Sequence, residues 1–113
     1  GAAALGDIGQ LYPNSDSRRR GASSLVFLEW AKRALTDQGW EPVHIDATVV
    51  ATRPQVMPKS QEIRATLAQA LGIEAGRVSV KATTNEGLGS LGRGEGIAAW
   101  ATATIRRSCP VLD

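Results

Sequence analysis

Lys81–Gly96, KATTNEGLGSLGRGEG, is the stretch around which the rest of the chain is organised. It places the adjacent hydroxyls of Thr83 and Thr84 and the carboxylate of Glu86 before a glycine-dense segment. A segment this polar cannot bury enough apolar area to offset its backbone entropy, which excludes a core element. Because strand-like runs precede and follow it, we predict an ordered loop that is held at both ends.

The composition of this loop suits phosphate and a divalent cation. Hydroxyls, a carboxylate and free backbone N–H groups bind such ligands. Glycines let the backbone approach a ligand closely, because no Cβ stands in the way. By composition alone, the segment is also typical of an ordinary hairpin connection between two strands. Both interpretations stay open at this level.

Alternating patterns on both sides of the loop predict strands over 77–82 and 97–107. In the first run, Val78, Val80 and Ala82 face inward. The second run has an apolar face and a face with Trp100 and threonines. Its apolar face consists of Ile97, Ala99, Ala101, Ala103 and Ile105. Small side chains there permit close approach of a helix or of a neighbouring subunit.

Two helices and one more strand are predicted upstream. Apolar residues recur at helical spacing over 25–38, with Ser23 as a capping residue and Gly39 as the end. A second helix contains Ile63, Leu67, Ala70 and Leu71 and stops at Gly72. Between them, residues 43–51 alternate as a half-buried strand. The opening GAAAL has good helix propensity and predicts the tail of a helix, closed by Gly6.

The order helix, strand, helix, strand, strand predicts an α+β fold, with helices on one face of a small mixed β-sheet. We expect one domain over residues 1–113, without an internal repeat. The other face of such a sheet needs a partner.

Composition restricts the class of protein. Hydrophobic content of 42% and charged content of 21% are those of an ordinary globular domain. A net charge of +2 argues against nucleic acid as a partner, and no apolar run is long enough for a membrane span. Arg18, Arg19 and Arg20 favour a solvated loop over a phosphate site. One cysteine, Cys109, fits a reducing bacterial cytoplasm or a plastid.

His44 is the one histidine of the sequence, and it shares a predicted polar strand face with Asp46. A metal site is conceivable there. A lone surface histidine is favoured, because zinc needs three or four convergent ligands.

Two blocks of the sequence resemble one family, the 2-C-methyl-D-erythritol 2,4-cyclodiphosphate synthases of the non-mevalonate isoprenoid pathway. The loop and its continuation, KATTNEGLGSLGRGEGIA, resemble the family signature KATTxExLGxxGRGEGIA. The opening GAAALGDIGQLYPNSD resembles the family block GAAxLGDIGxxFPxxD. The resemblance implies homotrimers with active sites between subunits.

The resemblance also implies an activity. These lyases convert 4-diphosphocytidyl-2-C-methyl-D-erythritol 2-phosphate to the 2,4-cyclodiphosphate and release CMP. Folding of the substrate and neutralisation of its phosphate charge supply most of the catalysis in such a transfer. Family members use zinc together with magnesium or manganese.

Site residues follow from the matched motifs. Asp7 and Gly9 would hold the methylerythritol hydroxyls, and Ala51 and Pro54 match a loop around the cytosine, where Gln55 replaces a lysine. The other implied positions lie in the signature. They are Ala82, Thr83 and Thr84 for the diphosphate and CMP, Thr84 and Glu86 for catalysis, Glu86 for magnesium, and Arg93 and Glu95 near the trimer axis.

At that axis several family members hold an isoprenoid diphosphate. A purely structural pair of Arg93 and Glu95 is an equal interpretation.

The family's zinc ligands, an Asp-x-His pair and a later histidine, precede the block that Gly1–Asp16 resembles, and His44 aligns with none of them. We therefore expect the chain to match the C-terminal two-thirds of the enzyme. We also expect it to lack the zinc ligands and to be inactive alone. Two alternatives stay open: a non-catalytic module that binds cytidine nucleotides, and a structural trimerisation domain.

Overall fold

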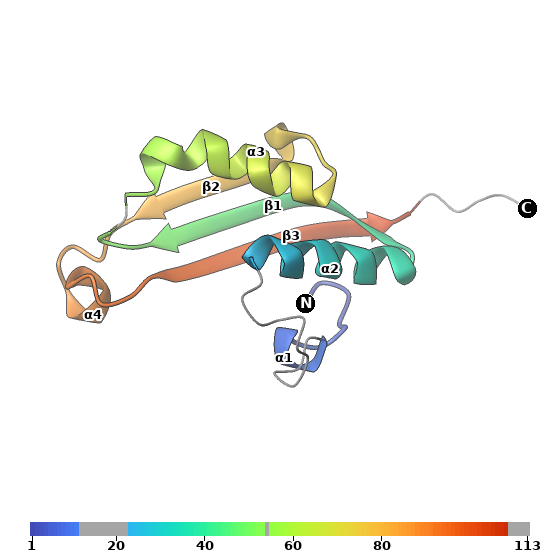
Figure 1. The fold of residues 1–113 in the computed structure, drawn as a ribbon, viewed down its shortest axis with the longest axis horizontal. Coiled ribbons are helices and arrows are strands. Elements are labelled where there is room, and N and C mark those ends of the chain that lie inside the picture. Colours follow the sequence, from blue (N-terminus) through green and yellow to red (C-terminus); the bar gives the residue numbers. More distant parts are fainter. Residues whose placement is uncertain (12–22, 54, 109–113) are drawn as a thin grey trace, which may run out of the picture.

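The computed structural model describes residues 1–11, 23–53 and 55–108. They form a three-stranded mixed sheet in the order β2-β1-β3, with helices α2 and α3 over one face (Figure 1). The main elements are α2 (Ser24–Asp37), β1 (Trp40–Val50), α3 (Ser60–Leu71), β2 (Val78–Thr83) and β3 (Ala98–Arg107). The short helices are α1 (Ile8–Leu11), η2 (Met57–Lys59), η3 (Ala75–Arg77) and α4 (Gly89–Gly92). The predicted α+β class is confirmed.

The helix boundaries are set by the local chemistry that the sequence predicts. The Ser23 hydroxyl accepts a hydrogen bond from the Leu25 N–H at 3.2 Å and so caps α2. Gly39 follows α2 with φ +80°, and Gly72 follows α3 with φ +67°. Because L-residues avoid this left-handed region, glycine is favoured at both helix ends.

The core lies between α3 and the sheet. It consists of Ala68, Val78 and Val80, and Val78 is 1% exposed. Val78 pairs with Ile45 of β1 in parallel register, so both side chains point to the same face. Full burial of a valine side chain contributes about 1.5–3 kcal/mol. The helix-facing side of the sheet is thus the stabilised side.

The opposite face of the sheet is largely open to solvent. Trp100 of β3 is 63% exposed, although a tryptophan offers a large apolar area. Lys81 and Asp46 pair on the same face at 3.2 Å, with about half of each side chain exposed. An exposed ion pair of this kind adds little stability. This face is therefore available to a partner.

The N-terminal segment differs from its prediction. Residues 1–7 are not helical, and the helix α1 begins after Gly6 instead of ending there. Asp7 caps α1, because its Oδ1 accepts the Gln10 N–H at 2.8 Å while its own N–H donates to Gln10 Oε1 at 3.0 Å. Helix propensity over the five residues GAAAL does not offset the free-energy cost of helix nucleation, and this explains why the prediction was wrong.

The glycine-rich loop connects two strands that are not neighbours. β1 is parallel to β2 and antiparallel to β3, and it lies between them. The loop must therefore cross the end of β1, so the interpretation as a hairpin connection is wrong. At its middle, α4 folds back on the start of the loop. A Cβ on Gly92 would come within 2.7 Å of the Gly87 carbonyl oxygen, so Gly92 leaves no room for a side chain.

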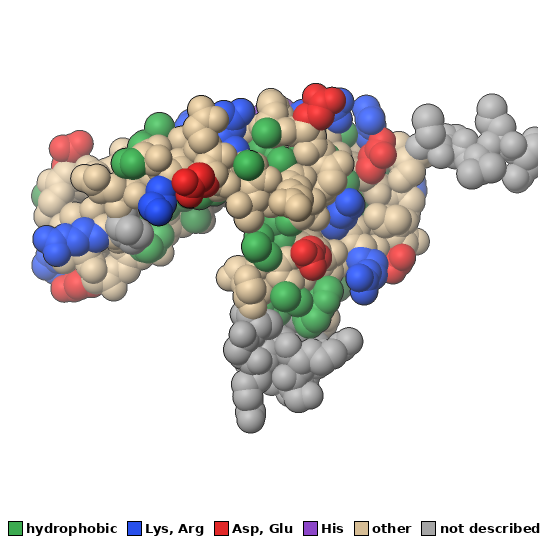
Figure 2. All heavy atoms as spheres, turned by 45° about the horizontal axis from the view of Figure 1, so that its top comes forward, with side chains coloured by type: hydrophobic (Ala, Val, Ile, Leu, Met, Phe, Trp, Pro, Cys, Tyr) green, Lys and Arg blue, Asp and Glu red, His purple; other side chains and the backbone are tan. Residues whose placement is uncertain are grey.

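The surface carries charges of both signs, and Figure 2 shows them interspersed over the face it displays. Arg93 pairs with Glu95, and Arg106 pairs with Glu41. Among the described residues, no helix is both long enough and apolar enough to cross a membrane.

Arg64 generates a prediction about stability. Its Nε donates to the Val78 carbonyl at 2.7 Å and its Nη2 to the Ala75 carbonyl at 3.1 Å. Lysine cannot make this forked pair of bonds. We expect Arg64→Lys to lower the free energy of unfolding in urea by about 1–2 kcal/mol. The exposed Arg33→Lys is the matched control, and an equal effect of both substitutions would contradict the prediction.

Gly92 generates a prediction about the loop. We expect Gly92→Ala to open residues 84–96 to protease, because the added Cβ collides with the Gly87 backbone. Gly76→Ala is the control, since a Cβ there has no neighbour within 4 Å. Limited proteolysis followed by mass spectrometry measures the effect. Cleavage that is no faster in Gly92→Ala than in Gly76→Ala would show that the close packing is unimportant.

Candidate functional site

The carboxyl ends of β1 and β2 meet at one edge of the sheet and form a pocket. Val50 pairs with Thr83, and the next N–H, that of Ala51, donates to the Thr83 carbonyl at 3.1 Å. The pocket has a volume of about 280 Å³. It is lined by Ala51, Thr52, Gln55, Val56, Met57, Pro58, Ala82, Thr83 and Thr84. Four of the residues predicted for the site, Ala51, Ala82, Thr83 and Thr84, therefore lie together.

The two sides of this pocket differ in chemistry. One side consists of Val56, Met57 and Pro58, which present apolar atoms, and Met57 is 54% exposed. The other side carries the hydroxyls of Thr83 and Thr84 at the end of β2. An apolar wall suits a flat ring, and hydroxyls with free backbone N–H groups suit phosphate oxygens. The pocket is therefore suited to a nucleotide.

Glu86 lies next to this pocket and has a strained backbone. Its N–H donates to the Thr84 hydroxyl at 3.3 Å, and its φ is +53°. A non-glycine residue in the left-handed region costs about 1–3 kcal/mol, and such strain clusters at ligand sites. Glu86 is exposed, and a carboxylate open to solvent fits magnesium, which takes few protein ligands and completes its shell with water and phosphate.

Asp7 and Gly9 lie in another part of the molecule, away from this pocket. Figure 1 shows α1 below α2, whereas α4 lies at the far left end of the molecule. One copy of the chain thus does not bring Asp7 and Gly9 to Thr84 and Glu86. Pro54, the remaining predicted substrate contact, is outside the described residues, as are Arg18–Arg20 and Cys109.

Arg93 and Glu95 form a forked ion pair next to α4. The Arg93 Nε and Nη2 donate to the two carboxylate oxygens at 2.8 and 3.1 Å. The bond to Glu95 raises the pKa of the Arg93 guanidinium above its ordinary value, against a smaller opposing effect of desolvation. The predicted pair is present, and its place at a trimer axis stays a prediction.

His44 is exposed on the open face of the sheet. Within the described part of the chain, no three His, Cys, Asp or Glu side chains gather in a way that could hold a metal ion. The absence of the family's zinc ligands from this chain stays a prediction.

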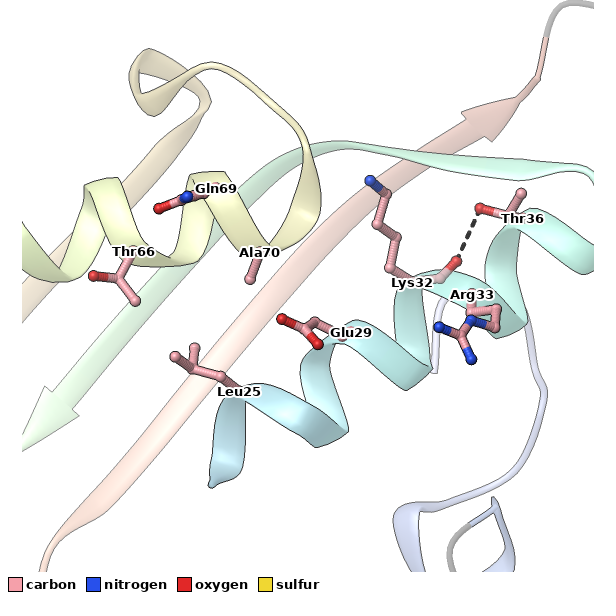
Figure 3. Close-up of a pocket in the computed structure, with 8 residues that line it drawn as sticks. All are labelled: Leu25, Glu29, Lys32, Arg33, Thr36, Thr66, Gln69 and Ala70. Atoms are coloured by element: carbon pink, nitrogen blue, oxygen red, sulfur yellow. Dashed lines mark hydrogen bonds between the residues drawn. The ribbon is translucent and has the colours of Figure 1, made fainter. Parts of the chain in front are cut away.

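A larger hollow of about 590 Å³ lies between α2 and α3 (Figure 3). Glu29 and Lys32 of α2 face Thr66 and Gln69 of α3 across it. Thr36 donates a hydrogen bond to the Lys32 carbonyl at 3.0 Å, which keeps this hydroxyl within its own helix. Half of its lining residues have long flexible side chains, and it contains none of the predicted site residues. We therefore place the site at the strand ends.

Sequence reasoning missed Thr52. Its hydroxyl hydrogen donates to the Leu91 carbonyl at 2.7 Å, and its oxygen lies 3.2 Å from the Gly92 carbonyl. The available signal was a hydroxyl directly after a strand, beside the predicted Ala51. The partner lies 39 residues away, so local patterns could not identify it.

Comparisons with known proteins identify a family whose sequences are similar to this chain. The model of the YgbB family matches residues 1–106. A 2-C-methyl-D-erythritol 2,4-cyclodiphosphate synthase of Rubrobacter xylanophilus is 48% identical over 108 residues, which are 96% of this chain and 65% of that protein. A bifunctional enzyme IspD/IspF of Anaeromyxobacter dehalogenans is 46% identical over 96% of this chain and 28% of its own length.

A solved structure is also similar. IspF of Plasmodium falciparum in complex with CDP superimposes with a TM-score of 0.82 at 26% identity, over 96% of this chain and 65% of that one. The chain thus spans just under two thirds of the two single-function relatives compared above. Because the family model covers most of the chain and the identity is high, the chain belongs to the YgbB family.

Proposed function

We propose that the chain supplies the nucleotide-binding part of a 2-C-methyl-D-erythritol 2,4-cyclodiphosphate synthase, a phosphorus–oxygen lyase. The substrate of the complete protein would be 4-diphosphocytidyl-2-C-methyl-D-erythritol 2-phosphate, and CMP would be released. The observation that carries the proposal is the pocket at the ends of β1 and β2, with Thr83 and Thr84 on one side. The named relatives and the CDP complex of a similar structure support this assignment.

The residues of the pocket have distinct roles in this proposal. The cytosine would lie along Val56, Met57 and Pro58, and backbone groups near Ala51 and Pro54 would read its edge. Thr84 would contact the diphosphate through its hydroxyl, beside Ala82 and Thr83. Such contacts hold the diphosphate in a fixed geometry, and orientation of this kind supplies much of the rate of an intramolecular transfer.

In this proposal, different residues would bind the two kinds of metal ion. Glu86 would hold magnesium or manganese, with phosphate oxygens and water completing the shell. The ion would neutralise phosphate charge. The zinc ligands would come from outside this chain. On this proposal the 113-residue chain alone does not turn over substrate.

A second copy completes the substrate site in this proposal. Asp7 and Gly9 would come from a neighbouring copy and hold the methylerythritol hydroxyls. The open sheet face, on which Trp100 is 63% exposed, would be buried in a homotrimer. Arg93 and Glu95 would lie near the axis, where an isoprenoid diphosphate is a candidate ligand.

A second candidate function is a non-catalytic module that binds cytidine nucleotides or holds a trimer together. It is favoured by one observation: the described residues that line the pocket include hydroxyls and apolar side chains but no His, Cys, Asp or Glu. Nucleotide binding would then need neither zinc nor another segment.

Calorimetry with CDP tests nucleotide binding. We expect the purified chain to bind CDP with a dissociation constant in the micromolar range and ADP at least about tenfold more weakly, because the larger purine does not fit the cytosine contacts. Thr84→Val should weaken CDP binding about tenfold. The control is Thr66→Val in α3, at an exposed position that lines the hollow between α2 and α3 and not the nucleotide pocket. If CDP does not bind at all, both the synthase and the nucleotide module are excluded, and a trimerisation domain remains.

The complete protein tests Glu86. We expect Glu86→Gln to lower magnesium-dependent turnover about 100-fold or more while zinc content stays unchanged, because the amide keeps the shape but loses the charge that holds the ion. Glu74→Gln, at an exposed position before η3, is the matched control. Turnover that is equal in Glu86→Gln and the unmodified protein would show that the assigned role is wrong.

A further inference from the structure

Thr52 connects two loops that are far apart in the sequence. It follows the end of β1 and lines the pocket together with Thr83 and Thr84. Its hydroxyl donates to the Leu91 carbonyl at 2.7 Å and lies 3.2 Å from the Gly92 carbonyl oxygen. Leu91 and Gly92 are the last two residues of α4. The Leu91 carbonyl also accepts the Gly94 N–H at 3.2 Å, so the Thr52 hydroxyl adds to the end of α4 a hydrogen bond that comes from another element.

The glycine-rich loop makes most of its hydrogen bonds within itself. The Gly92 and Arg93 N–H groups donate to the Leu88 and Gly89 carbonyls at 2.9 and 3.0 Å. In the described part of the chain, the other hydrogen bonds made by residues 84–96 join residues no more than five positions apart. Among the residues that the structure describes, the bond to Thr52 is therefore the hydrogen bond that joins this loop to another element.

We infer that Thr52 is a positioning residue that holds α4 against the connection between β1 and α3, and so sets the width of the nucleotide pocket. The Ala51 N–H, one residue earlier, donates to the Thr83 carbonyl. Adjacent residues thus fix the end of β2 and the turn of the loop that follows it. The nature of the ligand in this inference rests on the proposed function.

Loss of a positioning residue should affect one loop, whereas loss of a generally stabilising residue should also affect the core. Loss of the hydroxyl should release residues 84–96 and leave the core around Val78 intact, because α4 makes no part of that core. Serine keeps the hydroxyl and should keep the bond. Valine keeps the shape of threonine and removes the donor.

Hydrogen exchange tests the inference on the ligand-free 113-residue chain. The amides of Gly92, Arg93, Gly94 and Glu95 are hydrogen-bonded within the loop, so their exchange reports its opening. We expect Thr52→Val to speed their exchange about fivefold, the change that one ordinary hydrogen bond supports. Exchange in α3 and β2 should not change. Thr52→Ser should restore slow exchange, and Thr66→Val, which removes a bond within α3, should leave the loop unaffected.

Calorimetry with CDP on the same variants gives the second readout. We expect Thr52→Val to weaken CDP binding about fivefold and Thr52→Ser to stay within about twofold of the unmodified chain. Equal loop exchange in Thr52→Val and the unmodified chain would overturn the inference. Equally, faster exchange with unchanged CDP affinity would overturn the role in the pocket. Failure of the unmodified chain to bind CDP would refute the proposed function instead, and the exchange data would still decide whether Thr52 holds the loop.

Discussion

Parallel pairing of β1 with β2 is the constraint from which the site follows. Parallel strands end at the same edge of a sheet, and the segment between them, here containing α3, must return along one face. The core of Ala68, Val78 and Val80 stabilises this arrangement by burying apolar area between α3 and the sheet. Because Val50 pairs with Thr83, the loops after both strands begin side by side. The pocket is a direct consequence of this register.

The same topology explains the glycine-rich loop. A chain that leaves β2 and must enter β3 on the far side of β1 has to pass over the end of β1. Within this crossing, α4 packs closely against the start of the loop, and Gly92 permits it because no Cβ meets the Gly87 backbone. The crossing places the last carbonyls of α4 above Thr52, where the hydroxyl can reach them. The strand order thus requires the crossing, Gly92 permits its close packing, and the Thr52 hydrogen bond holds it in place.

Local signals in the sequence predicted most of the fold and part of the site. Ser23, Gly39 and Gly72 mark helix ends correctly because capping depends on a few neighbouring residues. GAAAL was predicted wrongly as a helix, since propensity over so few residues is weaker than the cost of nucleation. The contact between Thr52 and Leu91 could not be predicted, because it depends on strand order and not on sequence spacing.

The exposure of Trp100 follows from the way in which the helices cover the sheet. Two helices cover one face of a three-stranded sheet, and among the described residues none of the other elements lies over the opposite face. Apolar area at Trp100 then favours association through that face. Association of copies is also what could bring an N-terminal segment of one chain to the strand ends of another, since one copy keeps Asp7 and Glu86 apart. On the proposed function, association of copies would therefore both cover the open face of the sheet and complete the substrate site.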